Sequence, residues 1–128
     1  MNPTSATDLT GNTARDLAVA AAVAADDHHG TDITVVDVSA ILGLCEWFVI
    51  CSAGNPRLVA ALADRIEERV RDRYARSPIS VEGLDSREWV LLDYGDVVVH
   101  VFGTETRDLY RLERLYRDAP RVSWQPGD

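Results

Sequence analysis

Lysine is absent from this chain of 128 residues, because all 13 of its basic residues are arginine. The absence excludes three kinds of site: a P-loop that holds phosphate with its lysine, a Schiff-base lysine and a lysine general base. Cysteine is nearly as scarce, since only Cys45 and Cys51 are present and they form no CxxC pair. A zinc ribbon or a thioredoxin-like redox site is therefore not expected, and both thiols are predicted to be reduced and buried.

Long apolar runs and export signals are also missing. No run of the sequence is long enough to cross a bilayer. The first residues carry no basic group ahead of an apolar run, which is not the pattern of a signal peptide. Together these features predict a cytoplasmic protein with no membrane contact.

Positive charge is in short supply. Acidic residues number 21 against 13 basic ones, so the formal net charge at pH 7 is −8. Such a chain is poorly suited to binding nucleic acid through its phosphates, and its charge suits a basic partner protein. Solubility alone would explain the same charge. His28 and His29 are adjacent, so their side chains diverge, and we expect a solvated helix end there in preference to a metal site.

The hydrophobic content is 46%, which is enough for the core of one domain. We predict a flexible N-terminus over residues 1–12, a single domain over residues 13–120 and a tail over residues 121–128, with Trp124 packing back on the domain. Within the domain, apolar periodicity and turn residues predict eight elements in the order α-β-β-α-β-β-β-α. This order predicts an α/β (α+β) fold with a mixed β-sheet and flanking helices.

The elements have recognisable ends. The first helix spans residues 13–25 and stops at Gly30, and strands follow over residues 32–38 and 47–52. The long second helix begins with Asn55 as its N-cap and Pro56 in its first turn. Its buried stripe is predicted from apolar residues spaced by four: Leu58, Leu62, Ile66, Val70 and Tyr74. A short strand covers residues 79–81. A last helix begins at Thr104, its predicted cap, and ends just before Pro120, with Leu109, Leu112 and Tyr116 sharing one face.

The segment WVLLDYGDVVVHVF, residues 89–102, predicts a hairpin with Gly95-Asp96 as a two-residue turn. The resulting pairing places Val90, Leu92, Tyr94, Val97, Val99 and Val101 on one face, which belongs against a helix. The opposite face carries Trp89, Leu91, Asp93, Val98, His100 and Phe102. On this second face Asp93 is a diagonal neighbour of His100. Either the two side chains satisfy each other under a covering helix, or the face is partly open and reads a partner.

Enzymatic function has little support. Ser52 lies at a strand end before a helix, where helix amides could bind phosphate, but the loop SAGNP lacks a full glycine pattern. No strand offers an Asp-x-Asp pair for a metal-dependent transferase, since Asp32 and Asp37 fall at opposite ends of theirs. A nucleotide-binding or nucleotidyltransferase-like enzyme that uses the Ser52–Asn55 loop remains the alternative hypothesis.

Several segments together resemble one known family. WFVICSAGNPR, VEG, EWVLLDYGDVVVHVF and TRDLYRLERLYRDAP, in this order, resemble the ribosomal silencing factor family, also called RsfS or Iojap, over about residues 14–120. The chain departs from the family pattern at Asn55, Pro56 and Arg57, and it has Tyr116 where the family usually has tryptophan. The resemblance implies a nucleotidyltransferase-like fold without the catalytic acids and without enzymatic activity.

The resemblance also implies a partner. A protein of this family is expected to bind the large ribosomal subunit at ribosomal protein uL14, to block joining with the small subunit sterically, and to repress translation under nutrient limitation. A homodimer is expected when the protein is free, with no cofactor and no direct sequence-specific nucleic acid binding. We predict that the partner-binding patch has its centre at Trp89, Leu91, Asp93, His100 and Phe102 and extends to Arg107, Tyr110, Glu113 and Tyr116, with Asp93 and Glu113 pairing with basic groups of the partner.

Overall fold

The computed structural model describes residues 13–125, apart from the side chains of Glu113 and Leu115. The predicted flexible N-terminus, residues 1–12, and the end of the predicted tail lie outside this range. Five strands form one sheet in the order β1-β2-β5-β4-β3. β2 (Trp47–Ala53) and β5 (Val97–Gly103) are parallel, and every other neighbouring pair is antiparallel, including β1 (Thr31–Asp37) with β2. The predicted mixed sheet is therefore confirmed.

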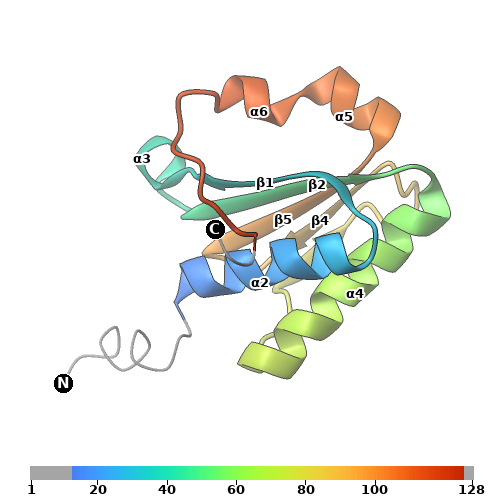
Figure 1. Ribbon diagram of the computed structural model, residues 1–128, viewed down its shortest axis with the longest axis horizontal. Coiled ribbons are helices and arrows are strands. Elements are labelled where there is room, and N and C mark those ends of the chain that lie inside the picture. The colour runs from blue at the N-terminus through green and yellow to red at the C-terminus, as the bar shows by residue number, and fades with distance from the viewer. Residues whose placement is uncertain (1–12, 126–128) are drawn as a thin grey trace.

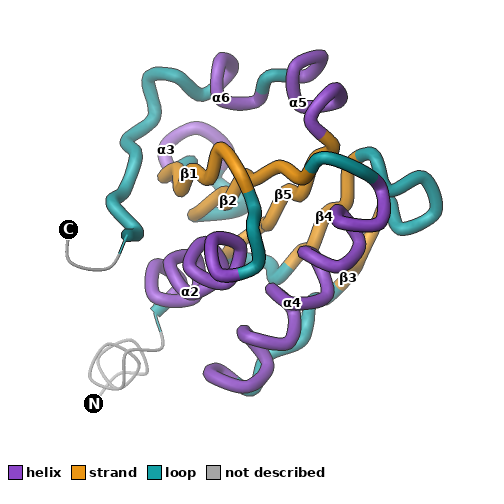
Figure 2. Tube along the Cα trace, turned by 45° about the vertical axis from the view of Figure 1, so that its right-hand side comes forward, coloured by secondary structure: helices purple, strands orange, loops and turns teal. Residues whose placement is uncertain are grey.

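Helices lie on both faces of the sheet, which makes three layers (Figure 1). α2 (Ala14–Asp27) and α4 (Pro56–Tyr74) lie side by side on the first face, while α5 (Thr104–Tyr110) and α6 (Leu112–Leu115) lie over the second (Figure 2). The short α3 (Ser39–Leu42) joins β1 to β2. No helix among residues 13–125 is long and apolar enough to span a membrane.

The two helices of the first face are specified by caps and small residues. Thr13 and Asp16 form a capping box at the start of α2, whose alanines are almost all buried, so this helix approaches the sheet closely. Asn55 caps α4 by accepting a hydrogen bond from the Leu58 amide at 2.9 Å, as predicted. The predicted buried stripe of α4 is wrong at Leu58, which is 42% exposed, because a strict spacing of four drifts off a helix with 3.6 residues per turn. Val59 is buried in its place.

The hairpin has the predicted register. β4 (Trp89–Asp93) pairs with β5 so that Trp89 faces Phe102 and Leu91 faces His100. Gly95 opens the two-residue turn with φ +90°, and the Tyr94 amide donates to the Val97 carbonyl at 2.9 Å. The valine-rich face is buried against α2 and α4. β3 (Ser80–Glu82) adds to the outer side of β4 as a short edge strand.

The last predicted helix is wrong in two respects. It is broken into α5 and α6 at Arg111, which adopts the left-handed conformation with φ +45°. The cap is Gly103, and the Thr104 hydroxyl instead donates to the Ala53 carbonyl. The break also turns the two helices relative to each other: Leu112 is buried on the second face of the sheet, whereas Leu109, predicted on the same helix face, is 77% exposed.

The segment after α6 returns along the free edge of β1. The Asp37 amide donates to the Pro120 carbonyl at 2.8 Å, and the Val122 amide donates to the Val35 carbonyl at 3.0 Å. The Trp124 indole N–H donates to the Ile33 carbonyl at 3.3 Å, so this tryptophan packs back as predicted. The tail therefore covers the edge of the sheet at β1. β3 forms the opposite edge.

Candidate functional site

An aromatic cluster occupies the second face of the hairpin. Trp89 on β4 stacks on its cross-strand partner Phe102 with ring centroids 4.8 Å apart. Tyr110 of α5 lies 4.9 Å from Trp89 and is 50% exposed. On the other side, Phe48 contacts both the His100 ring and Tyr116, at 4.5 and 5.3 Å. The half-buried and exposed rings thus stand on a row of buried ones.

His100 is 4% exposed and serves to hold Trp89. Its Nδ1 accepts a hydrogen bond from the Trp89 Nε1–H at 3.1 Å, which leaves the ring proton on Nε2. Burial lowers the pKa of His100 to about 4, so the ring is neutral at pH 7. Nε2 has no hydrogen-bond partner among residues 13–125. The hydrogen bond to Nδ1 fixes the plane of the Trp89 indole, and Nε2 has no group among the described residues with which to exchange a proton.

Asp93 bonds to its own turn and not to His100. Its Oδ1 accepts from the Gly95 amide at 2.8 Å, an Asx-type contact at the start of the hairpin loop. Of the two alternatives for this pair, internal pairing is therefore wrong, because each side chain finds a nearer partner within the hairpin. Asp93 is half-buried, so the residue remains partly accessible at the surface.

Arg107 of α5 is also turned inward. It is 7% exposed and donates to the Ser52 hydroxyl at 2.8 Å. Ser52 is itself buried at the end of β2, so neither side chain is presented to solvent. Cys51 beside it is fully buried, and burial raises the pKa of its thiol to about 12, which removes it as a nucleophile. The other cysteine, Cys45, is buried and free as well.

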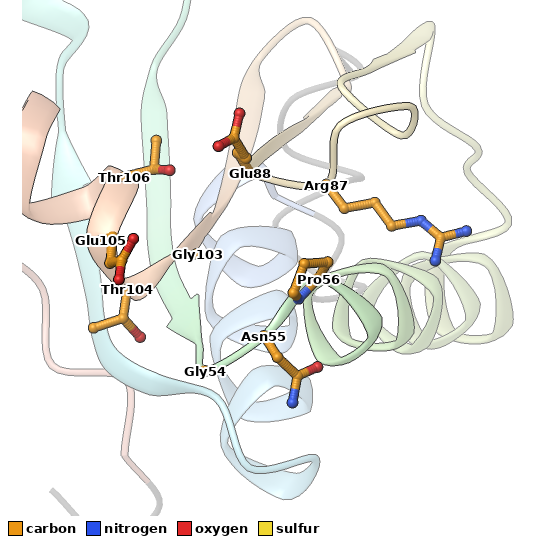
Figure 3. A pocket seen from close by; sticks show the side chains of 9 residues that line it. All are labelled: Gly54, Asn55, Pro56, Arg87, Glu88, Gly103, Thr104, Glu105 and Thr106. Carbon is orange, nitrogen blue, oxygen red and sulfur yellow. The ribbon is translucent and has the colours of Figure 1, made fainter.

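One cavity, of about 280 Å³, lies where the parallel strands β2 and β5 end and their helices leave to opposite faces (Figure 3). Such a crevice is where open α/β sheets usually bind ligands. Here, however, the Asn55 side chain is used as the cap of α4, and the lining carries two carboxylates, Glu88 and Glu105, against one basic residue, Arg87. The excess of one negative charge in this lining does not favour a phosphate. No group of three metal-ligating side chains occurs in the described part of the chain.

A second hollow, of about 290 Å³, opens on the surface beside Trp89. It is lined by Glu82, Gly83, Trp89 and Leu91. β3 pairs with β4 so that Glu82 stands opposite Leu91, which puts their side chains on the same face of the sheet. Gly83 has φ +88°, and a Cβ there would lie 1.9 Å from the Trp89 carbonyl oxygen, so only glycine fits.

The nine residues predicted as the partner-binding patch divide by exposure. Trp89, Leu91, Asp93 and Tyr116 are half-buried, and Tyr110 is exposed. His100, Phe102 and Arg107 are buried and act from beneath the surface, while the Glu113 side chain lies outside the described residues. Sequence reasoning missed Glu82, which lines the hollow beside Trp89. The position of Glu82 beside Leu91 follows only from the β3–β4 register, and no turn signal in the sequence specifies that register.

Comparison with known proteins gives one consistent family. A family model described as "Ribosomal silencing factor during starvation" matches residues 11–127. The chain is 40% identical over 100 residues to ribosomal silencing factor RsfS of Bacillus subtilis, which covers 78% of this chain and 84% of the relative. It is 36% identical to the chloroplastic protein Iojap of Zea mays, over 83% of this chain and 46% of that longer protein.

The fold is found in solved structures as well. A crystal structure of a Chromobacterium violaceum protein superposes with a TM-score of 0.77 and 31% identity, over 90% of this chain and 94% of that one. A Bacillus halodurans protein gives a TM-score of 0.67 and 32% identity, over 85% and 95%.

Proposed function

This chain belongs to the ribosomal silencing factor family, and on that premise we propose that it binds the large ribosomal subunit and prevents its joining with the small subunit. The match over residues 11–127 carries the proposal. The partner that fits best is the basic ribosomal protein uL14, on the face of the large subunit that meets the small one. Occupying that face excludes the small subunit sterically, so the protein acts by binding alone and represses translation when nutrients are limiting.

The surface that supports this role comprises Trp89, Leu91, Asp93, Tyr110 and Tyr116, here called the hairpin surface. It combines aromatic and apolar contact area with a carboxylate, a composition typical of the centre of protein interfaces. Buried Phe102 and His100 hold its tryptophan in one orientation, so little conformational entropy is lost on binding. The net charge of −8 favours encounter with a basic protein.

Two further features of the proposal concern the free protein. An exposed aromatic surface is normally protected in solution, and a homodimer that covers the hairpin surface would protect it. The B. subtilis relative and the other bacterial silencing factors favour action in the cytoplasm, where ribosomes assemble into translating particles.

Sedimentation with purified ribosomal particles tests the proposal. The protein should pellet with separated large subunits but not with small subunits, and it should lower the yield of joined ribosomes when the two subunits are mixed. Tyr110→Ala and Glu113→Arg should each reduce pelleting at least fivefold, because the first removes an aromatic contact and the second reverses a charge of the predicted partner-binding patch. Asp64→Arg, which changes an exposed acid of α4 on the other side of the sheet, is the matched control. Absence of wild-type pelleting with large subunits would refute the proposal.

A further inference from the structure

The hollow beside Trp89 lies on the part of the second face where the edge strand β3 meets β4. Figure 2 shows these two strands next to each other. Along β4, Trp89, Leu91 and Asp93 follow one another on this face. The β3 register adds Glu82 beside Leu91 and Ser80 beside Asp93. An apolar floor therefore has the Glu82 carboxylate across from Leu91, and Asp93 lies two residues further along β4, outside the lining of the hollow.

The walls of the hollow are held in place by the fold. Trp89 is fixed by its hydrogen bond to His100 and by stacking on Phe102. Gly83 closes the end of β3 against the Trp89 backbone, where no side chain fits. Preformed, concave surfaces of this kind bind one side chain of a partner without first having to order themselves.

Charge selects what can enter. Glu82 is exposed, and Asp93 uses one carboxylate oxygen for the Gly95 amide. The described residues that line the hollow include no basic group. Two arginines lie near the hairpin: Arg76 is held by Asp96 at 2.9 Å, and the side chain of Arg87, whose amide donates to the Gly83 carbonyl, donates to the Leu84 carbonyl at 3.4 Å. An anion would be repelled here, while a cationic group would gain a partner.

We propose that this hollow receives one arginine or lysine side chain of the basic protein that the molecule binds. The inference rests on the proposed function and assigns it a specific anchoring site. The apolar stem of the incoming side chain packs on Trp89 and Leu91, and its charged end pairs with the Glu82 carboxylate, with Asp93 as the second acid. A volume of about 290 Å³ is roughly ten times the share of one water molecule in the liquid, so a long side chain fits.

The first test measures the affinity for purified large ribosomal subunits at several salt concentrations. Glu82→Arg should weaken binding at least tenfold, because it places a like charge where the cation enters. Glu82→Gln should weaken it about threefold and flatten the dependence on salt. Asp64→Arg makes the same change of charge on α4 and should leave the affinity within twofold of wild type. Equal affinities for wild type and Glu82→Arg would overturn the inference while leaving the proposed function intact.

The second test does not use ribosomes. A blocked Gly-Arg-Gly tripeptide is titrated into the ¹⁵N-labelled protein, with a blocked Gly-Gly-Gly tripeptide as the neutral control. The arginine peptide should shift the signals of the Trp89 indole and the Leu91 amide more than that of the Trp124 indole, and Glu82→Gln should abolish the difference. If these shifts occur but large subunits are not bound, the proposed function fails and the cation site stands. If the Trp89 and Leu91 signals do not respond, the cation site is refuted.

Discussion

At the scale of single residues, His100 shows how burial turns a titratable group into a structural one. Its Nδ1 must stay unprotonated to accept from Trp89, and its neighbours Phe48 and Phe102 offer no charge to stabilise an imidazolium. Protonation would therefore break the contact that orients the central residue of the hairpin surface. The conformation of Trp89 and the stability of the fold are linked to the same proton.

This linkage predicts that acid destabilises the protein through His100. The folded-state pKa of about 4 lies below the ordinary histidine pKa of 6.5, so the unfolded chain binds the proton more readily between these two values. The stabilisation of the folded state by neutral His100 is complete above pH 6.5 and is lost as the pH falls towards 4. At pH 4 the decrease in the free energy of unfolding reaches about 3 kcal/mol. Urea unfolding at pH 7 and pH 4.5 measures the change.

The variant His100→Asn isolates the effect of this one group. Its side-chain oxygen replaces Nδ1 as the acceptor and does not titrate in this range. We expect the variant to be less stable than wild type at pH 7, because it leaves space beside Phe48, and to lose less stability on acidification. The same loss in both proteins would show that other groups account for the acid sensitivity.

Residue-scale contacts were also where sequence reasoning was weakest. The diagonal placement of Asp93 and His100 was correct, yet one of the two alternatives drawn from it, an internal pair, was wrong. Strand geometry brings Cβ atoms together but does not determine which of several nearby donors forms the hydrogen bond to a given side chain. Here the Gly95 amide lies two residues from Asp93, and the Trp89 indole reaches His100 along the same face. Such local competition is settled by side-chain rotamers, which the pattern of residue types does not encode.

At the scale of elements, prediction succeeded where one signal fixes several residues at once. The Gly95-Asp96 turn determined the register of the whole hairpin, because a two-residue loop and a period of two leave no freedom. The Asn55-Pro56 start of α4 was equally specific. The break at Arg111 had no such signal, since arginine favours helices and rarely adopts positive φ. That break redirected Leu109 from the core to the surface.

The tail on β1 leads to a prediction about the edge of the sheet. Val122→Pro removes the N–H that donates to the Val35 carbonyl, so the tail should detach from β1. The Asp37 amide, which donates to Pro120, should then exchange its hydrogen at least tenfold faster. Hydrogen exchange followed by NMR measures this rate, and Val122→Ala, which keeps the amide, is the control. If the rate is unchanged in Val122→Pro, the tail does not depend on this strand-like pairing.

At the scale of the whole molecule, the two faces of the sheet have different tasks. The first face is closed by α2 and α4 and contains most of the core, including the valines of the hairpin. The second face is only partly covered by α5 and α6, and its smaller core supports the hairpin surface from below. Under the proposed function, stability and recognition are therefore separated across one sheet, so surface side chains on the second face can change with little cost to folding.

This separation allows the overlap of dimer and ribosome surfaces to be tested directly. If one surface serves both, Tyr110→Asp should weaken dimerisation and large-subunit binding together, each by at least fivefold, since it places a charge in an aromatic contact. Leu58→Asp, at an exposed apolar position of α4, should affect neither. Sedimentation equilibrium gives the dimer affinity, and pelleting gives the subunit affinity. With a shared surface, the dimer must dissociate before it can bind a subunit. The apparent affinity for large subunits should therefore fall at protein concentrations that favour the dimer. Loss of subunit binding with an unchanged dimer would place the two contacts on separate surfaces.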